Sequence, residues 1–306
     1  MTAVQVRHVP VLAEAVAALA GGRARAVDGT VGGGGHAALM LQAGAQVLGV
    51  DADPAAVATA RERLDPGRAT VHYGRFADPA ILRAIHEFQP DFILLDLGVS
   101  SHQLDSDVRG FSFRPGIALD MRMDPDDGRT AAQVLNDDRE AELARVFREH
   151  ADEPRARRLA RAIVRRRQSR PFATSDDLVN AIREVLGPRA GPADFARLFQ
   201  AVRIEVNDEL GQLERALPAL RDALVPGGML AVISYHSGED RIVKRAFAGW
   251  VRWCVCPPGQ PVCTCRGRPL GALNPRRATT PTPDQVAANP RARSARLRGF
   301  VKAYAP

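Results

Sequence analysis

The chain has 306 residues, a length typical of one large globular domain or two average ones. Its residues are 45% hydrophobic and 25% charged, and this composition excludes collagen-like, coiled-coil and wholly disordered proteins. Basic residues outnumber acidic ones by 42 to 35, and the net charge of +7 permits a nucleic-acid partner without requiring one. No apolar run approaches the roughly 18 residues of a membrane span, so we expect a cytoplasmic protein without a signal peptide.

Short apolar runs alternate with helical patterns over the first hundred residues. The pattern predicts helices between successive strands, and the predicted strands are 24–27, 47–50, 69–73 and 92–95. The intervening helices are predicted over 37–43, 54–64 and 79–88. Strands that are separated by helices favour an α/β fold with a parallel sheet.

The pattern changes after residue 100. Residues 101–128 are predicted to form a long loop, and from Thr130 to about Leu186 the pattern is only helical. The pattern is again helical over 195–224, a strand is predicted over 229–234, and the tail from Cys254 is predicted to be irregular. We therefore expect one domain in two parts around a helical insertion, with bounds 1–110, 111–200 and 201–306.

A glycine-rich segment, 28–36 (DGTVGGGGH), follows the first predicted strand and opens a helix. Consecutive glycines let a ligand approach the backbone closely and permit positive φ angles. Gly32, Gly34 and Ala37 also match the dinucleotide fingerprint G-x-G-x-x-A, and Asp51 lies 19 residues beyond Gly32. Two ligands compete for this loop, a nicotinamide dinucleotide and S-adenosylmethionine.

Acidic residues stand at the ends of three predicted strands, namely Asp28, Asp51 and Asp96. Asp51 suits the ribose hydroxyls of either ligand. Asp28 would repel a pyrophosphate but attract the ammonium of a methionine moiety. Three acids at strand ends make a poor pocket for phosphates, so the residues favour the cationic methyl donor.

Further segments resemble one family, the bacterial 16S ribosomal RNA cytosine-N4 methyltransferases of the RsmH/MraW type. They cover nearly the whole chain in order, and are 8–12 (HVPVL), 28–36, 96–101 (DLGVSS) with Gln103, 109–113 (RGFSF), 119–124 (LDMRMD), 199–204 (FQAVRI), 234–244 (SYHSGEDRIVK) and 289–298 (NPRARSARLR). The resemblance implies a Rossmann-like class I methyltransferase sheet with an inserted all-helical domain that recognises RNA. It also implies S-adenosylmethionine as donor and a cytidine in the decoding region of 16S rRNA, within the small ribosomal subunit, as acceptor.

The resemblance also assigns binding residues in the donor pocket. These are Gly34, Gly35, His36, Asp51, Phe76, Asp96 and Gln103. Phe76 can instead belong to the core, and Gln103 can be a loop residue on the surface. Asp53 is a second candidate for the ribose, although a cap for the helix that begins at Pro54 is its better interpretation.

The chemistry of an exocyclic amine suggests a role for Asp96. The cytosine N4 lone pair is delocalised, so acceptors must engage the N–H groups as the methyl group moves. Asp96 and the carbonyls of Leu97 and Gly98 are the candidate acceptors. A flipped base is also sandwiched by aromatic or apolar groups. The candidates are Phe111, Phe113 and Tyr235, and the two phenylalanines have anchoring of the long loop as their alternative role.

Eight arginines lie between Arg155 and Arg170, with no acids interleaved after Arg155. We interpret this run as an RNA phosphate surface that includes Arg165 and Arg166, with a solvated helix face as the alternative. The arginines of the tail, at 291, 293, 296 and 298, can hold RNA or pack over the sheet, and the sequence does not choose between these roles.

All four cysteines lie within twelve residues, at Cys254, Cys256, Cys263 and Cys265. Four thiolates can bind zinc, but the usual spacing is Cys-x2–4-Cys. Structural zinc and reduced thiols both stay open, and disulfides are the least favoured alternative in a reducing cytoplasm. For the whole protein, the alternatives to a methyltransferase are a nicotinamide dehydrogenase and a non-catalytic RNA-binding protein.

Overall fold

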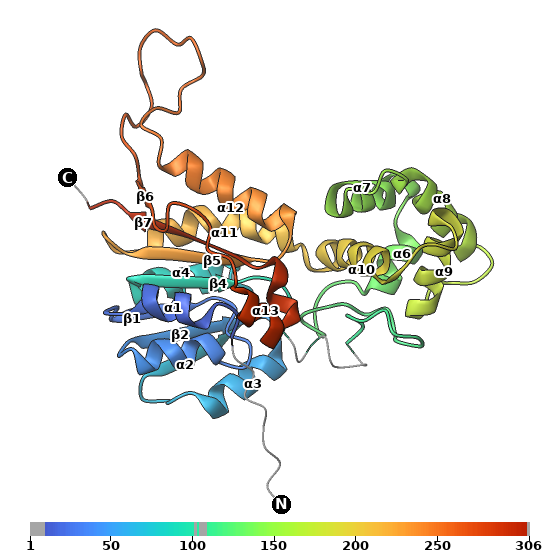
Figure 1. The fold of residues 1–306 in the computed structure, drawn as a ribbon, viewed down its shortest axis with the longest axis horizontal. Helices are drawn as coiled ribbons and strands as arrows, with labels where there is room; N and C mark the ends of the chain where they lie inside the picture. The colour runs from blue at the N-terminus through green and yellow to red at the C-terminus, as the bar shows by residue number, and fades with distance from the viewer. Residues whose placement is uncertain (1–9, 101–102, 104–108, 305–306) are drawn as a thin grey trace, which may run out of the picture. The chain divides into compact units, whose positions relative to one another are not determined.

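The computed structural model describes residues 10–100, 103 and 109–304, and these residues form two compact units (Figure 1). The sheet unit comprises the chain up to Gly98 and from Leu210 onward, and the helical unit comprises Val99–Glu209. The expected insertion, 111–200, lies within the helical unit, but its end at 200 falls inside a continuous helix, α10 (Pro192–Asn207). No helix among the described residues is long and apolar enough to cross a membrane.

The sheet unit is built on a seven-stranded sheet with the order β3-β2-β1-β4-β5-β7-β6. The strands are β1 (Arg25–Asp28), β2 (Gln46–Asp51), β3 (Ala69–Tyr73), β4 (Phe92–Asp96), β5 (Met229–Ser234), β6 (Gly271–Leu273) and β7 (Arg296–Lys302). The first five strands are parallel, whereas β7 pairs antiparallel with both β5 and β6. The expected α/β class with a parallel sheet is confirmed.

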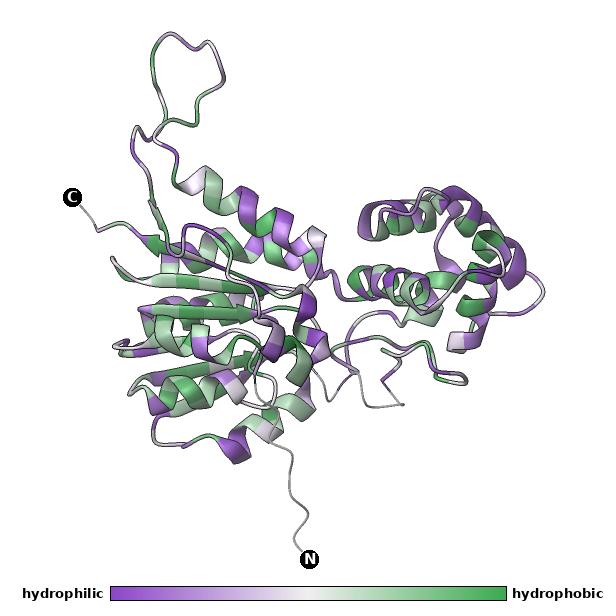
Figure 2. Ribbon diagram, viewed as in Figure 1, coloured by the Kyte–Doolittle hydropathy of each residue, from purple (hydrophilic) through white to green (hydrophobic). Residues whose placement is uncertain are grey.

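Helices cover both faces of this sheet. Phe92 and Leu94 of β4 pack in a core with α1 (Ala13–Ala20), α2 (Gly35–Gln42) and α3 (Pro54–Arg63). Ile93 and Leu95 pack in the opposite core with α4 (Pro79–Phe88), α11 (Glu209–Ala223) and α12 (Ser237–Trp250). Figure 2 accordingly shows the central strands mostly in the hydrophobic colour. A strand that is buried on both faces is apolar throughout, which explains the unbroken run that predicted β4.

The helical unit packs five described helices around a core of its own. They are α6 (Ala131–Asp137), α7 (Glu140–Ala151), α8 (Ala156–Arg167), α9 (Ser175–Leu186) and α10. The core contains the apolar faces of these helices together with Phe111 and Leu119 from the segment before α6. Residues 109–130 contain no helix or strand, as expected for the described part of the predicted loop.

The structure confirms one prediction about the second half of the chain and corrects another. The stretch predicted to be helical over 195–224 consists of two helices, because Asp208 adopts a left-handed conformation with φ 48° between α10 and α11. The tail is not irregular, since it contains β6, β7, α13 (Pro283–Ala288) and the 3-10 helix Pro290–Ser294. β7 forms hydrogen bonds with β5 on one side and β6 on the other, and this pairing cannot be inferred from the local sequence.

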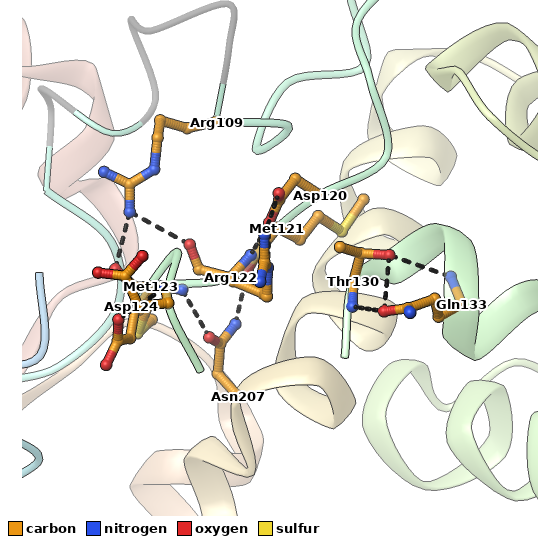
Figure 3. Close-up of polar contacts among 10 residues, drawn as sticks. Arg109, Asp120, Met121, Arg122, Met123, Asp124, Thr130, Gln133 and Asn207 are labelled. Atoms are coloured by element: carbon orange, nitrogen blue, oxygen red, sulfur yellow. Dashed lines mark hydrogen bonds and ion pairs between the residues drawn. The ribbon is translucent and has the colours of Figure 1, made fainter. Parts of the chain in front are cut away.

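A buried amide holds the long loop of the helical unit in place (Figure 3). The side chain of Asn207 is 2% exposed; it accepts from the Met123 N–H at 2.8 Å and donates to the Met121 carbonyl at 2.8 Å. The Arg109 guanidinium donates to the Met123 carbonyl at 2.7 Å. At Gly110, where φ is 75°, a Cβ would lie 2.6 Å from both Ala118 O and Asp120 N, so only glycine is accommodated.

We predict that Asn207→Ala lowers the stability of the helical unit by about 2–4 kcal/mol, because it leaves two buried backbone groups without their partner. Urea unfolding of the full chain measures the loss, and amide hydrogen exchange over 109–130 assigns it to this loop. Gln133→Ala is the control, since Gln133 accepts from Thr130 N in an exposed cap. A loss no larger than that of the control would contradict the role of Asn207.

Candidate active site

Three carboxylates meet at one edge of the sheet. Asp28, Asp51 and Asp96 are the last residues of β1, β2 and β4. Because these strands are parallel neighbours, their carboxyl ends lie together, as the sequence predicted. The charges of Asp51 and Asp96 both act on Asp28, and the site is therefore an acidic pocket.

Asp51 organises the glycine-rich loop. Its carboxylate accepts from the Gly32 N–H at 2.8 Å and from the Asp53 N–H at 2.9 Å. Gly34 has a φ of 78° just before α2 begins at Gly35, so the chain turns there in a conformation that glycine favours. Asp53 is buried and caps α3 by accepting from the Ala55 N–H at 3.0 Å, which confirms its predicted capping role. The ribose contact of Asp51 stays a prediction.

Asp96 is held from three directions. The Tyr235 hydroxyl donates to its Oδ1 at 2.7 Å, and His36 Nε2 lies 3.4 Å from its Oδ2 in an ion-pair contact. Its backbone N–H donates to the Thr30 hydroxyl at 2.7 Å. The carboxylate therefore has a defined orientation at the end of β4.

Glu239 helps to shape the candidate site, although the sequence did not single it out. It is 2% exposed, and its Oε2 accepts from the Tyr235 N–H at 2.8 Å and the His236 N–H at 3.3 Å. His236 and Glu239 form a capping box at the start of α12, which places Tyr235 directly beside Asp96. The spacing of a capping residue and a Glu three positions later was the available signal.

Asp28 and His36 carry polar atoms that need a partner. Among the described residues, Asp28 Oδ2 and His36 Nδ1 are buried without a hydrogen-bond partner, and His36 Nε2 has only its 3.4 Å ion-pair contact with Asp96. Burial raises the pKa of Asp28 to about 7, and the negative charges of Asp96 and Asp51 add to the rise, although His36 and the Thr30 N–H oppose it. Burial disfavours the charged form of His36, but Asp96 and Asp28 outweigh it and raise its pKa.

Burial is also the main cause of the raised pKa of Asp51, about 6, which the N–H groups of Asp53 and Gly32 partly offset. An acidic pocket with orphaned carboxylate and imidazole atoms suits a ligand that carries both a cation and a carboxylate. A methionine moiety has both groups, and the sulfonium adds a second positive charge.

The remaining residues predicted for the donor pocket lie in two places. Phe76 is partly buried against the core of α4 and α11, and it lies beside Gly29 in the glycine-rich loop. Gln103 belongs to the helical unit, where it is buried and accepts from the Ser100 N–H at 3.0 Å. The donor contacts that the resemblance implies for these two residues stay predictions. Residues 8 and 9 of the first motif, and 101 of the third, lie outside the described residues.

The phenylalanines proposed to stack the base belong to the core of the helical unit. Phe111 is 8% exposed in this core, and Phe113 makes edge-to-face contacts with Phe195 and Phe199 at centroid separations of 6.0 and 6.1 Å. This packing accounts for both residues as anchors of the loop.

The arginine run makes more internal contacts than the sequence indicated. Arg165 and Arg166 both bind Glu184 of α9, the latter at 2.8 Å. The run has no interleaved acid, but Glu184 of the neighbouring helix neutralises part of it. Contact between these arginines and RNA phosphates stays a prediction. In the tail, Arg298 packs back onto the sheet unit and binds both oxygens of Asp240 at 2.7 and 3.0 Å.

The sheet order, the glycine-rich loop after β1 and the acids after β2 and β4 define the class of this protein. It is a Rossmann-like class I methyltransferase, with S-adenosylmethionine as its methyl donor.

Comparisons with known proteins identify the family. A model described as the MraW methylase family matches residues 5–303. The chain is 56% identical to "Ribosomal RNA small subunit methyltransferase H" of Gemmatimonas aurantiaca, over 97% of this chain and 95% of that protein. The chain is also 45% identical to the protein of the same name from Heliobacterium modesticaldum, over 96% of this chain and 98% of that protein. An rRNA methylase structure from Streptococcus thermophilus aligns over 95% of this chain and 94% of its own, with 11% identity and a TM-score of 0.41. By the family model and the two relatives, the chain belongs to the MraW methylase family.

We predict that the buried carboxyl of Asp28 makes the ligand-free protein less stable as the pH rises from about 4 to about 7. In this pH window Asp28 keeps its proton in the folded protein but has lost it in the unfolded chain, so each rise in pH favours unfolding. Asp28→Asn should remove this decline and gain roughly 2–4 kcal/mol relative to wild type at pH 8. Urea unfolding at pH 5 and pH 8 measures the difference, with the exposed Asp126→Asn as control.

The same carboxyl should act in the opposite direction on donor binding. Affinity for S-adenosylhomocysteine, which keeps the ammonium, should rise with pH through about 7 as Asp28 ionises. Calorimetry of the wild type and Asp28→Asn across this range tests the point. Equal pH dependence in the two proteins would place the ammonium elsewhere.

Proposed function

We propose that this methyltransferase modifies the N4 amine of a cytidine in the decoding region of 16S rRNA, within the small ribosomal subunit of the cytoplasm. The names of the two relatives support small-subunit rRNA as the substrate. The observation that carries the chemistry is the oriented carboxylate of Asp96, between Tyr235 and His36 at the end of β4. Membership of a methylase family argues against the nicotinamide dehydrogenase and the non-catalytic RNA-binding protein.

Asp96 meets the main chemical requirement of the reaction. S-adenosylmethionine supplies an electrophilic methyl group on a sulfonium. Oδ1 of Asp96 accepts from the Tyr235 hydroxyl, and Oδ2 lies 3.4 Å from His36 Nε2. Each carboxylate oxygen has two lone pairs, so we assign a remaining lone pair of this carboxylate as the acceptor for an N–H group of the target amine. A carboxylate there localises the lone pair of N4 and offsets the positive charge that develops on it. The carbonyls of Leu97 and Gly98 are the remaining candidate acceptors.

Tyr235 acts through Asp96 in this scheme and is a positioning residue. Its ring lies against Gly98, where a Cβ would meet Cδ2 at 3.5 Å, and its hydroxyl is committed to the carboxylate. Burial, followed by the charge of Asp96, raises its pKa, so the hydroxyl stays a hydrogen-bond donor. Stacking of the base on this ring stays a prediction.

The exposed start of α8 is our candidate surface for RNA. Of the eight arginines from Arg155 to Arg170, six have partners within the helical unit, whereas the side chains of Arg157 and Arg158 have none among the described residues. The six are Arg155, Arg161, Arg165, Arg166, Arg167 and Arg170. Arg157 and Arg158 line an open depression of about 600 Å³ together with Arg148. Unpaired guanidinium groups are available for phosphates without breaking an existing ion pair.

Incubation of the protein with S-adenosylmethionine and small ribosomal subunits, followed by mass mapping of the rRNA nucleosides, tests the function. We expect one N4-methylated cytidine in the decoding region. Methylation of another atom or another rRNA segment would refute the proposed target while leaving the methyltransferase class intact.

We predict that Asp96→Asn lowers the single-turnover rate by about 10²–10³, or roughly 2.7–4 kcal/mol, when donor and RNA are both saturating. Tyr235→Phe keeps the ring, and its single-turnover rate should fall only about tenfold, as expected for the loss of one hydrogen bond to a charged group. RNA affinity should stay unchanged in both, because the charge develops only as the methyl group moves. A wild-type rate in Asp96→Asn would assign the acceptor role to the carbonyls of Leu97 and Gly98.

We predict that Arg157→Gln with Arg158→Gln flattens the slope of log affinity for RNA against log salt by up to about two. The matched control is Arg165→Gln with Arg166→Gln, which removes the same formal charge from the same helix but from side chains that already bind Glu184. The control should change the slope less. Equal slopes in the two double variants would indicate a general effect of net charge, and an unchanged slope would make this end of α8 a solvated face.

A further inference from the structure

The loop between α12 and β6, residues 251–270, has no hydrophobic core of its own. None of its side chains is buried, and its larger apolar residues face solvent, with Trp253 at 70% and Val262 at 69% exposure. Arg266 closes the base of the loop by donating to the carbonyls of Gly249 and Arg252 at 2.6 and 3.1 Å. Burial of apolar surface therefore does not offset the conformational entropy that this loop loses when it is ordered, so another interaction must stabilise it.

The four cysteines of the chain converge inside this loop. Their sulfur atoms all lie within 4.8 Å of one another, although the cysteines occur in two pairs separated by a proline-containing turn. All four are free thiols. The Sγ atom of Cys263 lies 3.8 Å from that of Cys254, 4.0 Å from that of Cys256 and 3.5 Å from that of Cys265.

These separations match a single tetrahedral metal centre. A Zn–S bond of about 2.3 Å gives a tetrahedron whose edges are about 3.8 Å, and the recorded sulfur separations of 3.5 to 4.0 Å lie around that value. The Val255 N–H also donates to Cys265 Sγ at 3.3 Å, the kind of outer contact that supports a sulfur ligand. The short Cys-x-Cys spacing is therefore compatible with one centre when the turn brings the two pairs together.

We propose that Cys254, Cys256, Cys263 and Cys265 bind one structural Zn²⁺ ion that folds this loop. Each cysteine binds as a thiolate and releases its proton to solvent, so four negative charges surround one dication. Four thiolates saturate a tetrahedral ion and leave no position open for water or substrate, which makes the site structural and not catalytic. The site is independent of the methyl-transfer chemistry proposed above.

The position of the loop predicts which properties the metal affects. α12 begins at Ser237, next to Tyr235, and ends at Trp250, so its 14 residues separate the donor pocket from the loop by roughly 20 Å. Loss of zinc should therefore loosen residues 251–270 without weakening donor binding.

Metal analysis of the purified full chain and of its Co²⁺-substituted form tests the proposal. We expect about one zinc ion per chain, and the visible absorption of a tetrahedral tetrathiolate site in the Co²⁺ form. Cys254→Ser and Cys263→Ser should lose the metal, the Co²⁺ spectrum and the resistance of the loop to proteolysis. Thr264→Ala is the matched control, because it lies between two of the cysteines and keeps all four thiols.

Affinity for S-adenosylhomocysteine, measured on the same variants, separates this proposal from the proposed function. It should stay unchanged when the metal is lost. Four freely titrating thiols in zinc-supplemented protein, two disulfides by intact mass of the unreduced protein, or bound iron in place of zinc would each overturn the assignment. Retention of zinc by both cysteine variants would overturn it as well.

Discussion

Burial of negative charge at one edge of the sheet is the constraint on which the site depends. A carboxylate that leaves water must find hydrogen-bond donors or a cation, or its pKa rises. Asp51 finds the N–H groups of Gly32 and Asp53, and Asp96 finds the hydroxyl of Tyr235. Asp28 keeps one oxygen without a partner among the described residues, and the pKa rises most clearly there. The missing positive charge is what a cationic methyl donor brings.

The contacts that position the acidic residues also hold the surrounding loop and helix in place. The bond from Gly32 to Asp51 holds the glycine-rich loop against the end of β2, and Glu239 caps α12 while it fixes the backbone of Tyr235. Helix termini and strand ends supply polar backbone groups at defined positions, so few side chains are needed to orient Asp96.

Charge in the helical unit serves packing as much as recognition. Arg167 donates to the Leu135 and Asp138 carbonyls near the end of α6, and Arg155 reaches the Val185 and Leu186 carbonyls at the end of α9. Such contacts favour a cation at the negative end of a helix dipole. The number of arginines in a segment therefore overstates the charge that is available to RNA.

The alternation of strands and helices over the first hundred residues, the glycine-rich loop and the acids at strand ends are all readable from the sequence. They depend on local periodicity and on the rule that parallel strands end at one edge. The tertiary structure decided the rest: the insertion of β7 between β5 and β6, the pairing of Arg166 with Glu184, and the burial of Phe111. Each joins residues from separate elements, and whether a side chain is buried, paired or free depends on what the fold places beside it. Local sequence alone does not contain that information.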